Sequence, residues 1–509
     1  MKFTVLPIGT AVPTNLKNHL YLMTDGWDDW FEFNTLYSLV VVNGTGNIIN
    51  IGSVKIGQFD MEEKQSRANL PQTFNSLNEQ FFSIGQDDSY YENLNELRDF
   101  NGADILNALK DIALDSELYD RAIEERVTKI SLLRSVSHTV IKGQYRRLAN
   151  GGARLSEYSF KYKSPKPKNG YDEIVLDFDV EPESNPSTNI HVLIGRNGVG
   201  KTHLINNMIS SLIDETAKKS KVGQFISEKD ESEELFANVV SVTFSAFDES
   251  EPLAEKKDKS SGIQYSYVGL KRVKKSGETN LAPKSPVILK NEFIKSILSC
   301  RAGSKISRWK NAISVLESDP VFLNLNITEI LYIEDEDEFK KTAGDLFKNL
   351  SSGHKIVLLT ITRLVETVEE RSLVFLDEPE AHLHPPLLSA FIRSLSNLLI
   401  NRNGVAIIAT HSPVVLQEVP KSCAWKLWRS GHNTKVERLE TESFGENIGV
   451  LTREVFGLEL THSGFHKILT EAVEEHSSYI RALRSFDDQL GMEAKGILKA
   501  LYLTEGNAQ

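Results

Sequence analysis

The sequence is poor in cysteine: only Cys300 and Cys423 occur in 509 residues. Two cysteines without metal-ligand spacing exclude a disulfide scaffold and favour a reducing compartment. Long apolar runs are also missing, since no stretch approaches the ~18–20 residues that span a bilayer. The short apolar start of the chain is interrupted by Pro7, which is unlike a signal peptide. We therefore predict a cytoplasmic protein with no membrane partner.

Positive charge is in the minority, because 58 Lys and Arg residues face 70 Asp and Glu residues, for a net charge of -12. This balance excludes a polycation that coats nucleic acid, so any DNA or RNA site must be a local basic patch. Hydrophobic residues make up 40% and charged residues 25%, which is globular composition and excludes a disordered or collagen-like chain. The length fits roughly two to four structural units, or one large domain with insertions.

The first part of the chain carries no catalytic motif. Two β-prone stretches, Leu36–Val42 and Ile48–Ile56, flank turn-forming residues and predict a hairpin. A helical pattern then runs from about 92 to 148 and ends at a Gly-Gly pair. We predict an N-terminal accessory domain at 1–150, a hairpin followed by helices.

Beyond this boundary, short apolar strands alternate with helical patterns, which indicates an α/β fold with a largely parallel sheet. The strands that carry the later argument are 190–194, 372–376 and 405–410. We predict a head domain at 151–460 with a mostly helical insertion at about 214–345, and a helical tail at 461–509.

A glycine-rich loop, Gly195–Thr202, matches G-x-x-x-x-G-K-[ST] and lies between a strand and a helix, as that motif requires. Its glycines let several backbone N–H groups point at one phosphate, and the following helix N-terminus favours negative charge. Lys201 would reach the β- and γ-phosphates of ATP, and Thr202 would ligate Mg²⁺. The loop residues expected at the nucleotide are Gly195, Asn197, Gly198 and Gly200. The alternative is a chance match in which the glycines only form a turn.

The apolar strand 372–376 ends in two carboxylates, Asp377 and Glu378. Strands of such a sheet point their last residues into the crevice at the carboxyl edge. We expect Asp377 to hold Mg²⁺ and Glu378 to polarise the attacking water as general base. The alternative is that both acids only begin a turn before Pro379.

Leu350-Ser351-Ser352-Gly353-His354 stands ahead of this acidic pair and opens an amphipathic helix. Small hydroxyl residues at a helix N-terminus form an anion-binding surface, although an ordinary Ser N-cap has the same pattern. The segment resembles the signature motif of ABC-type ATPases in its residues, in its order along the chain and in its spacing before the acidic strand. The resemblance implies an α/β, ABC-type P-loop ATPase head in which Ser351, Ser352 and Gly353 contact the ATP held by a second chain.

His411, in Ala409-Thr410-His411-Ser412-Pro413, ends the strand 405–410 and resembles the switch histidine of the same family, which contacts the γ-phosphate. A satisfied polar histidine is the alternative. Two features depart from the family: Ser245–Asp248 has no Q-loop glutamine, and the D-loop, Pro379–Pro385, is unusual. The pair His382 and His384 could indicate a metal, but without a third ligand nearby, helix capping or D-loop contacts fit better.

Glu378–Pro385 and Thr410–Pro413 resemble the RecF/SMC/OLD-like branch of these ATPases. Phe444–Asn447 and the helical tail resemble the PtuA-type ATPases of the Septu anti-phage defence system. The sequence has no Toprim cluster of the OLD nucleases and no HNH constellation. The resemblance therefore implies a separate HNH-type nuclease partner. Since each motif occurs once and a composite site needs both, it also implies a homodimer or higher homo-oligomer.

Two stretches are locally basic. Residues 271–310 hold eleven bases and two acids, a net charge of +9, and residues 142–168 hold eight bases and one acid among Tyr145, Tyr158, Phe160 and Tyr162. Bases can neutralise phosphates and aromatic rings can stack on nucleobases, which makes 271–310 a possible nucleic-acid site. The alternatives are a solvated face, a docking surface for an acidic partner and, for the aromatic residues, core packing.

Three functions therefore remain open. The first is an ATPase that dimerises around two ATP molecules and regulates a partner nuclease. The second is a RecF-like DNA-repair ATPase that acts on DNA ends or gaps. The third is a nucleotide-gated scaffold with negligible hydrolysis, which the missing Q-loop glutamine favours.

Overall fold

The computed structural model describes residues 1–26, 32–62, 65–97, 99–152, 155–166, 173–182, 184–227, 235–244, 251–256, 263–273, 282–301, 305–430, 433–457, 464–487 and 489–506. None of the helices in this part of the chain combines the length and the apolar character needed to cross a membrane.

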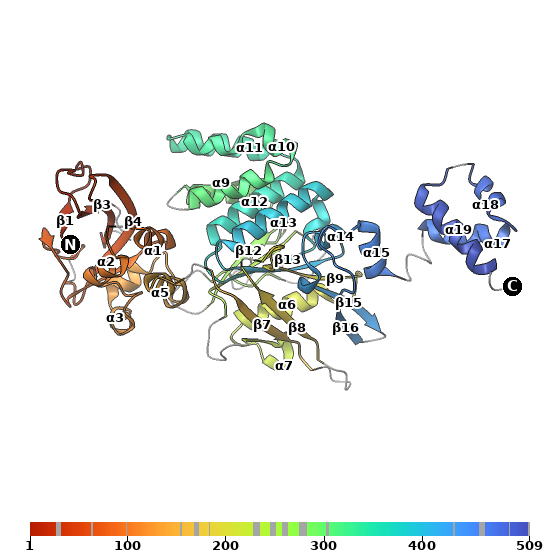
Figure 1. The fold of residues 1–509 in the computed structure, drawn as a ribbon, viewed down its shortest axis with the longest axis horizontal. Helices are drawn as coiled ribbons and strands as arrows, with labels where there is room; N and C mark the ends of the chain where they lie inside the picture. Colours follow the sequence, from red (N-terminus) through yellow and green to blue (C-terminus); the bar gives the residue numbers. More distant parts are fainter. Residues whose placement is uncertain are drawn as a thin grey trace.

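The N-terminal region forms one sheet with helices packed on it (Figure 1). Its described strands are ordered β5-β1-β2-β3-β4-β6, and all neighbours pair antiparallel except β1 and β2. The sequence analysis identified only the β3–β4 hairpin. The strands are β1 (Phe3–Leu6), β2 (His19–Thr24), β3 (Leu36–Val42), β4 (Ile48–Gln58), β5 (Thr73–Phe74) and β6 (Phe81–Gly85).

Several helices of this region begin where the sequence offers a capping side chain. Asp87, Asn101 and Asp115 each accept a hydrogen bond from a first-turn N–H, which satisfies groups that a helix start leaves unpaired. The helices are α1 (Asp88–Asn95), α2 (Gly102–Ala108), α3 (Ser116–Ala122), η1 (Thr128–Leu132), α4 (His138–Val140), η2 (Ile141–Tyr145) and α5 (Arg146–Ala149).

The head is built on a second sheet, ordered β12-β11-β13-β14-β9-β15-β16 in the described residues. All neighbours pair parallel except β15 and β16. A small antiparallel sheet, β10-β7-β8, covers one face together with α6. The strands are β7 (Tyr158–Lys163), β8 (Val175–Val180), β9 (Ile190–Gly195), β10 (Gln224–Ser227), β11 (Asn238–Thr243), β12 (Gln264–Gly269), β13 (Ser372–Asp377), β14 (Val405–Thr410), β15 (Ala424–Ser430) and β16 (Asn433–Arg438).

Successive residues of β13 alternate between two apolar cores. Leu373 and Phe375 pack on the side of α6, whereas Val374 and Leu376 pack on the side of α12 and α13. Figure 1 shows α12 and α13 on one side of the strands and α6 on the other. The helices of the head are α6 (Lys201–Ile213), α7 (Lys219–Val222), α8 (Pro286–Cys300), α9 (Lys305–Leu316), α10 (Pro320–Leu325), η3 (Ile327–Tyr332), α11 (Glu336–Asn349), α12 (Ser352–Thr367), η4 (Pro379–His382), α13 (Pro385–Ile400), α14 (Pro413–Leu416), η5 (Lys421–Cys423) and α15 (Ile448–Phe456).

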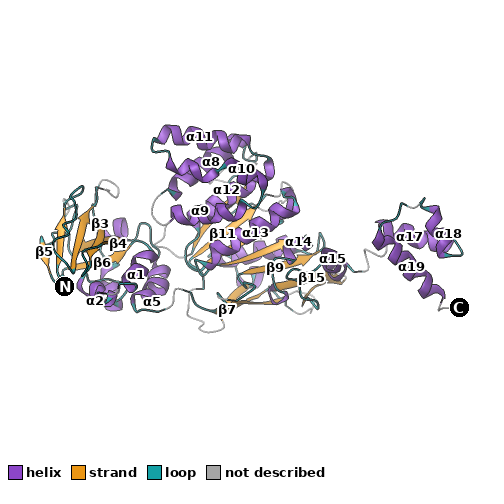
Figure 2. Ribbon diagram, turned by 45° about the horizontal axis from the view of Figure 1, so that its top comes forward, coloured by secondary structure: helices purple, strands orange, loops and turns teal. Residues whose placement is uncertain are grey.

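The region that we expected to be a mostly helical insertion, 214–345, is not helical throughout. Its strands β11 and β12 belong to the main sheet, and β11 is buried along its whole length between β12 and β13. Helices α8 to α11 lie above α12 and α13 (Figure 2). Beyond the head, α17 (Gly464–Glu475), α18 (Tyr479–Ser485) and α19 (Met492–Gly506) share a small core of their own.

The accessory domain meets the head at the amino-terminal edge of the parallel sheet. Arg402, which precedes β14, forms a 2.6 Å ion pair with Asp88 of α1, and both side chains are buried, at 10% and 3% exposure. Arg147 pairs with Glu370, just before β13, at 2.9 Å. A cavity of about 620 Å³ lies between the two regions. The contact is therefore made largely by charged groups.

We predict that Asp88→Ala destabilises the folded chain by about 3–5 kcal/mol, because it leaves the buried Arg402 guanidinium without its nearest anion. The measurement is the free energy of unfolding from a urea titration. Asp104→Ala, which removes an exposed acid from the same domain, is the control and is expected to change it by less than about 0.5 kcal/mol. Equal stability of the two variants would contradict the role of this ion pair.

Candidate nucleotide site

The phosphate loop connects the buried strand β9 to helix α6. Gly198 and Gly200 have φ angles of +80° and +99°, in the left-handed region where a side chain is strained. Gly195 is required for a different reason: a Cβ there would lie 2.3 Å from the carbonyl oxygen of Leu427. Asn197 is exposed on the loop, and Thr202 is half-buried in the first turn of α6. Each of the three glycines in the loop is therefore required, either by its backbone conformation or by the close approach of a neighbouring carbonyl oxygen.

Lys201 is buried at 4% exposure, and its side chain folds back over the loop. Its Nζ donates hydrogen bonds to the carbonyl oxygens of Gly195 and Arg196, both at 2.9 Å. Burial lowers the pKa of Lys201, and the nearby carboxylates of Glu378, Asp377 and Glu380 partly offset this effect. Lys201 therefore interacts electrostatically with the carboxylates at and just after the end of β13.

The acidic pair lies where the sequence analysis expects it, at the carboxyl end of β13. Asp377 is buried and is paired in register with Thr243 on β11 and Ala409 on β14. Glu378 adopts φ +48° and ψ +57°, and its backbone N–H donates to the carbonyl of Ala409 at 2.9 Å. A left-handed conformation costs a non-glycine residue ~1–2 kcal/mol and is found preferentially at functional sites.

Glu380 is a residue of the site that the sequence analysis did not select. Its Oε1 accepts hydrogen bonds from the Thr410 hydroxyl at 2.5 Å and from the His411 backbone N–H at 2.8 Å. His411 Nδ1 lies 3.2 Å from Glu380 and 3.6 Å from Glu378. Glu380 thus ties the end of β13 to the end of β14. The signal that could have identified it is the second acid of Glu378-Pro379-Glu380.

The signature segment lies on the other side of the sheet, because α12 packs in one core and α6 in the other. Ser351 is the N-cap of α12, and both Ser351 and Ser352 are exposed. Gly353 is buried against the D-loop, where a Cβ would lie 2.6 Å from the carbonyl oxygen of His382. The structure therefore presents the two serines to solvent and holds the glycine tightly against η4.

Most bases of the segment 271–310 that the structure describes have partners within the chain. Lys284 pairs with Glu292 at 2.8 Å, and Arg308 pairs with Asp87 of the accessory domain at 3.2 Å. Other donors reach backbone carbonyl or aromatic groups. These are Arg301 with Ile333 and Phe339, Lys305 with Glu366, and Lys310 with Tyr332. Arg272 and Lys295 are exposed, and Lys274, Lys275 and Glu278 lie outside the described residues.

The aromatic residues of the second basic stretch belong to the core. Tyr145, Tyr158, Phe160 and Tyr162 are all buried, and along β7 buried and half-buried positions alternate. They are therefore not a stacking surface for nucleobases. The Q-loop position, Ser245–Asp248, lies outside the described residues.

A phosphate loop, an acidic strand end and a strand-end histidine thus lie along the carboxyl ends of three neighbouring parallel strands, β9, β14 and β13. Together with the signature helix, this arrangement defines a P-loop ATPase domain of the ABC type. Residues 190–417 match the family model described as AAA domain, putative AbiEii toxin, Type IV TA system.

The chain is 42% identical to protein ea59 of Escherichia phage lambda over 535 residues, which cover 100% of both proteins, so it belongs to the ea59 family. Among solved structures, it is similar to cbiO1 from Clostridium perfringens, part of an ABC transporter complex, at 13% identity, with 52% and 82% of the two chains covered and a TM-score of 0.28. It is also similar to UvrA2 from Deinococcus radiodurans at 12% identity, with 59% and 38% covered and a TM-score of 0.26.

We predict that Lys201→Ala weakens ATP binding by at least about a hundredfold, because the phosphates lose a cation that the loop holds in a low-dielectric position. Isothermal titration calorimetry with ATP and Mg²⁺ measures the effect. Lys218→Ala removes an exposed lysine beyond α6 and is the matched control. Unchanged affinity in Lys201→Ala would disprove the phosphate-loop assignment.

We predict that Glu378→Gln keeps ATP binding but lowers the hydrolysis rate by about two orders of magnitude or more, because an amide cannot accept the proton of the attacking water. Glu380→Ala should instead destabilise the fold by about 1–3 kcal/mol, since it leaves Thr410 and the His411 N–H without their acceptor. Phosphate release and urea unfolding separate the two effects. Wild-type turnover in Glu378→Gln would remove Glu378 as the general base.

Proposed function

We propose that this protein hydrolyses ATP at two composite sites formed between two copies of the chain. The observation that carries the proposal is the division of the motifs between the two faces of the sheet. Lys201, Glu378 and His411 gather at the carboxyl edge, whereas Ser351 and Ser352 are exposed at the start of a helix on the opposite face. A γ-phosphate bound by one copy then meets the signature of the other.

In this proposal each group has a definite task. The loop N–H groups and Lys201 neutralise the phosphates, and Glu378 accepts the proton of the attacking water. Thr202 and Asp377 would hold Mg²⁺, because their hydroxyl and carboxylate oxygens are the hard donors that this ion requires. The ion would balance charge on the transferred phosphoryl group. His411, held by Glu380, would contact the γ-phosphate.

The downstream task proposed for this switch is the regulation of a separate HNH-type nuclease in anti-phage defence. It rests on the resemblance to PtuA-type ATPases and on the absence of a nuclease constellation from the sequence. An affinity-tagged chain purified from its native host should bring the nuclease with it. Salt-sensitive, ATP-dependent binding to gapped duplex DNA by the isolated chain would favour the repair alternative instead.

Contact with nucleic acid through residues 271–310 stays a prediction. Nine of its bases lie in the described residues: five have the partners given above, Lys271 and Lys290 are half-buried, and Arg272 and Lys295 are the exposed candidates. Two separated bases make a weak phosphate-binding surface. Nucleic acid would then reach the complex mainly through the partner nuclease.

We predict that Ser352→Arg abolishes hydrolysis while each chain still binds ATP, because the bulky cation blocks only the signature side of the composite site. An equal mixture with Lys201→Ala should recover about one quarter of the wild-type rate per dimer. Half of randomly paired dimers are mixed, and each mixed dimer has one intact site. Steady-state phosphate release measures this recovery.

Two controls make the test specific. Ser314→Arg adds the same charge to an exposed position of α9 and should retain wild-type hydrolysis. A chain carrying both Lys201→Ala and Ser352→Arg should show no recovery with either single variant, because every site then contains a defect. Full-rate hydrolysis by a chain shown to be monomeric under the assay conditions would overturn the composite site.

A further inference from the structure

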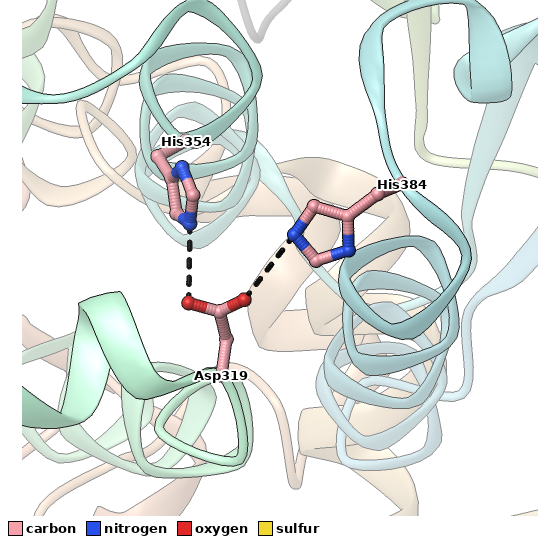
Figure 3. A group of neighbouring side chains, drawn as sticks. All are labelled: Asp319, His354 and His384. Atoms are coloured by element: carbon pink, nitrogen blue, oxygen red, sulfur yellow. Dashed lines mark hydrogen bonds and ion pairs between the residues drawn. The ribbon is translucent and has the colours of Figure 1, made fainter.

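Three side chains from separate parts of the head meet beside the signature (Figure 3). Asp319 is the N-cap of α10, His354 lies in the first turn of α12, and His384 is the N-cap of α13. We call them the Asp-His-His cluster. Of the two histidines considered in the sequence, only His384 takes part; His382 is exposed and lies outside the cluster.

The donor atoms of the cluster converge on a small volume. His354 Nε2 lies 3.1 Å from Asp319 Oδ1, and His384 Nε2 lies 3.5 Å from Asp319 Oδ2. All three donor atoms are within 4.8 Å of one another. A tetrahedral zinc ion with bonds of about 2.0–2.2 Å holds its ligands roughly 3.3–3.5 Å apart. Small side-chain rotations are therefore enough to bring these atoms into a coordination sphere.

The charge of Asp319 is the second observation. Its carboxylate is 4% exposed, and the ion-pair partners that the described residues provide are the two histidines, with no lysine or arginine. Backbone N–H groups of Val321 and Phe322 also donate to Oδ1, at 2.8 and 3.4 Å. A buried carboxylate calls for a compensating cation. A neutral imidazole carries no charge, so the compensating cation is either a protonated histidine or a bound metal ion.

We propose that the Asp-His-His cluster binds one divalent transition-metal ion of the zinc class. Imidazole nitrogen with one carboxylate oxygen is a donor set typical of zinc and its neighbours, whereas Mg²⁺ and Ca²⁺ prefer oxygen donors alone. His384, 52% exposed, gives the ion a route from solvent and leaves room for a water ligand. The ion would join α10, the signature helix α12 and the D-loop end of α13.

The ion would also set the hydrogen on the signature serine, an effect that rests on the proposed function of Ser351. Ser351 Oγ lies 2.6 Å from His354 Nδ1. When Nε2 of a neutral imidazole coordinates a metal, its proton must reside on Nδ1, which then donates to the serine oxygen. The serine O–H is thereby free to donate to a phosphate. Without metal, His354 Nε2–H donates to Asp319, and the Ser351 O–H donates to His354 Nδ1 and is not available to a phosphate.

Coordination by His384 has a structural consequence as well. Its Nδ1 accepts the hydrogen bond of the Leu387 N–H at 3.3 Å, which caps α13 and places the ring proton on Nε2. Coordination through Nε2 moves that proton to Nδ1 and releases the cap. Metal binding should therefore loosen the first turn of α13 while it joins His384 to the signature helix.

The test is a titration of the chelator-treated, full-length protein with Zn²⁺ by calorimetry, and with Co²⁺ followed by its visible absorption. Asp377→Asn is present throughout, so that the proposed Mg²⁺ position does not contribute. We expect one ion per chain. Asp319→Asn, His354→Gln and His384→Asn should each weaken binding at least about tenfold. Asparagine can still cap α10 and α13, so the Asp319 and His384 variants keep their helix caps.

His382→Gln is the matched control, because it removes an exposed histidine two residues from the cluster and should leave the affinity unchanged. If the chain binds no zinc, or if the three cluster variants bind it like His382→Gln, the cluster is a hydrogen-bonded capping arrangement and the proposal is wrong. The titration uses no nucleotide. A negative zinc titration would therefore not count against the composite ATP site. A negative result for the composite site would likewise not count against zinc binding.

Discussion

The structure depends on the convergence of parallel strand ends at one edge of a buried sheet. Strands β13, β14 and β9 are adjacent, and each ends in residues of the candidate nucleotide site. The carboxylates of Glu378, Asp377 and Glu380 lie close enough to Lys201 to raise its pKa against the effect of burial, so the ends of β13 and β9 interact electrostatically. Glu380 then fixes β13 to β14 through Thr410 and the His411 backbone. The strained backbone of Glu378 is maintained by this fixed surrounding.

The two faces of the same sheet separate the functions of the head. Helix α6 packs on one face and carries the phosphate loop, whereas α12 and α13 pack on the other and carry the signature and the D-loop. Rigid burial of both helices prevents either from crossing the sheet. The composite site proposed above needs both motifs and therefore combines two chains. Within one chain, the close packing of Gly353 against the His382 carbonyl holds the signature next to the D-loop.

Local motifs could be predicted from the sequence because their information lies in consecutive residues. The phosphate loop needs glycine at positions of positive φ, and the strand-end acids follow an apolar run. Glu380 and Asp319 were missed because their importance arises from partners 30 and 35 residues away. Strands β1, β2, β5 and β6 of the accessory domain were missed as well, since loops of varied length separate them and no single turn signal sets their order.

The accessory domain is attached at the opposite edge of the sheet from the candidate nucleotide site. Arg402 and Glu370 stand immediately before β14 and β13, and they bind Asp88 and Arg147 of the accessory domain. The same two strands, each six residues long, end in Thr410 and Asp377. Because both strands are fully buried, their ends cannot shift independently. A displacement of β13 or β14 at the carboxyl edge would therefore also move the residues that hold the accessory domain at the opposite edge.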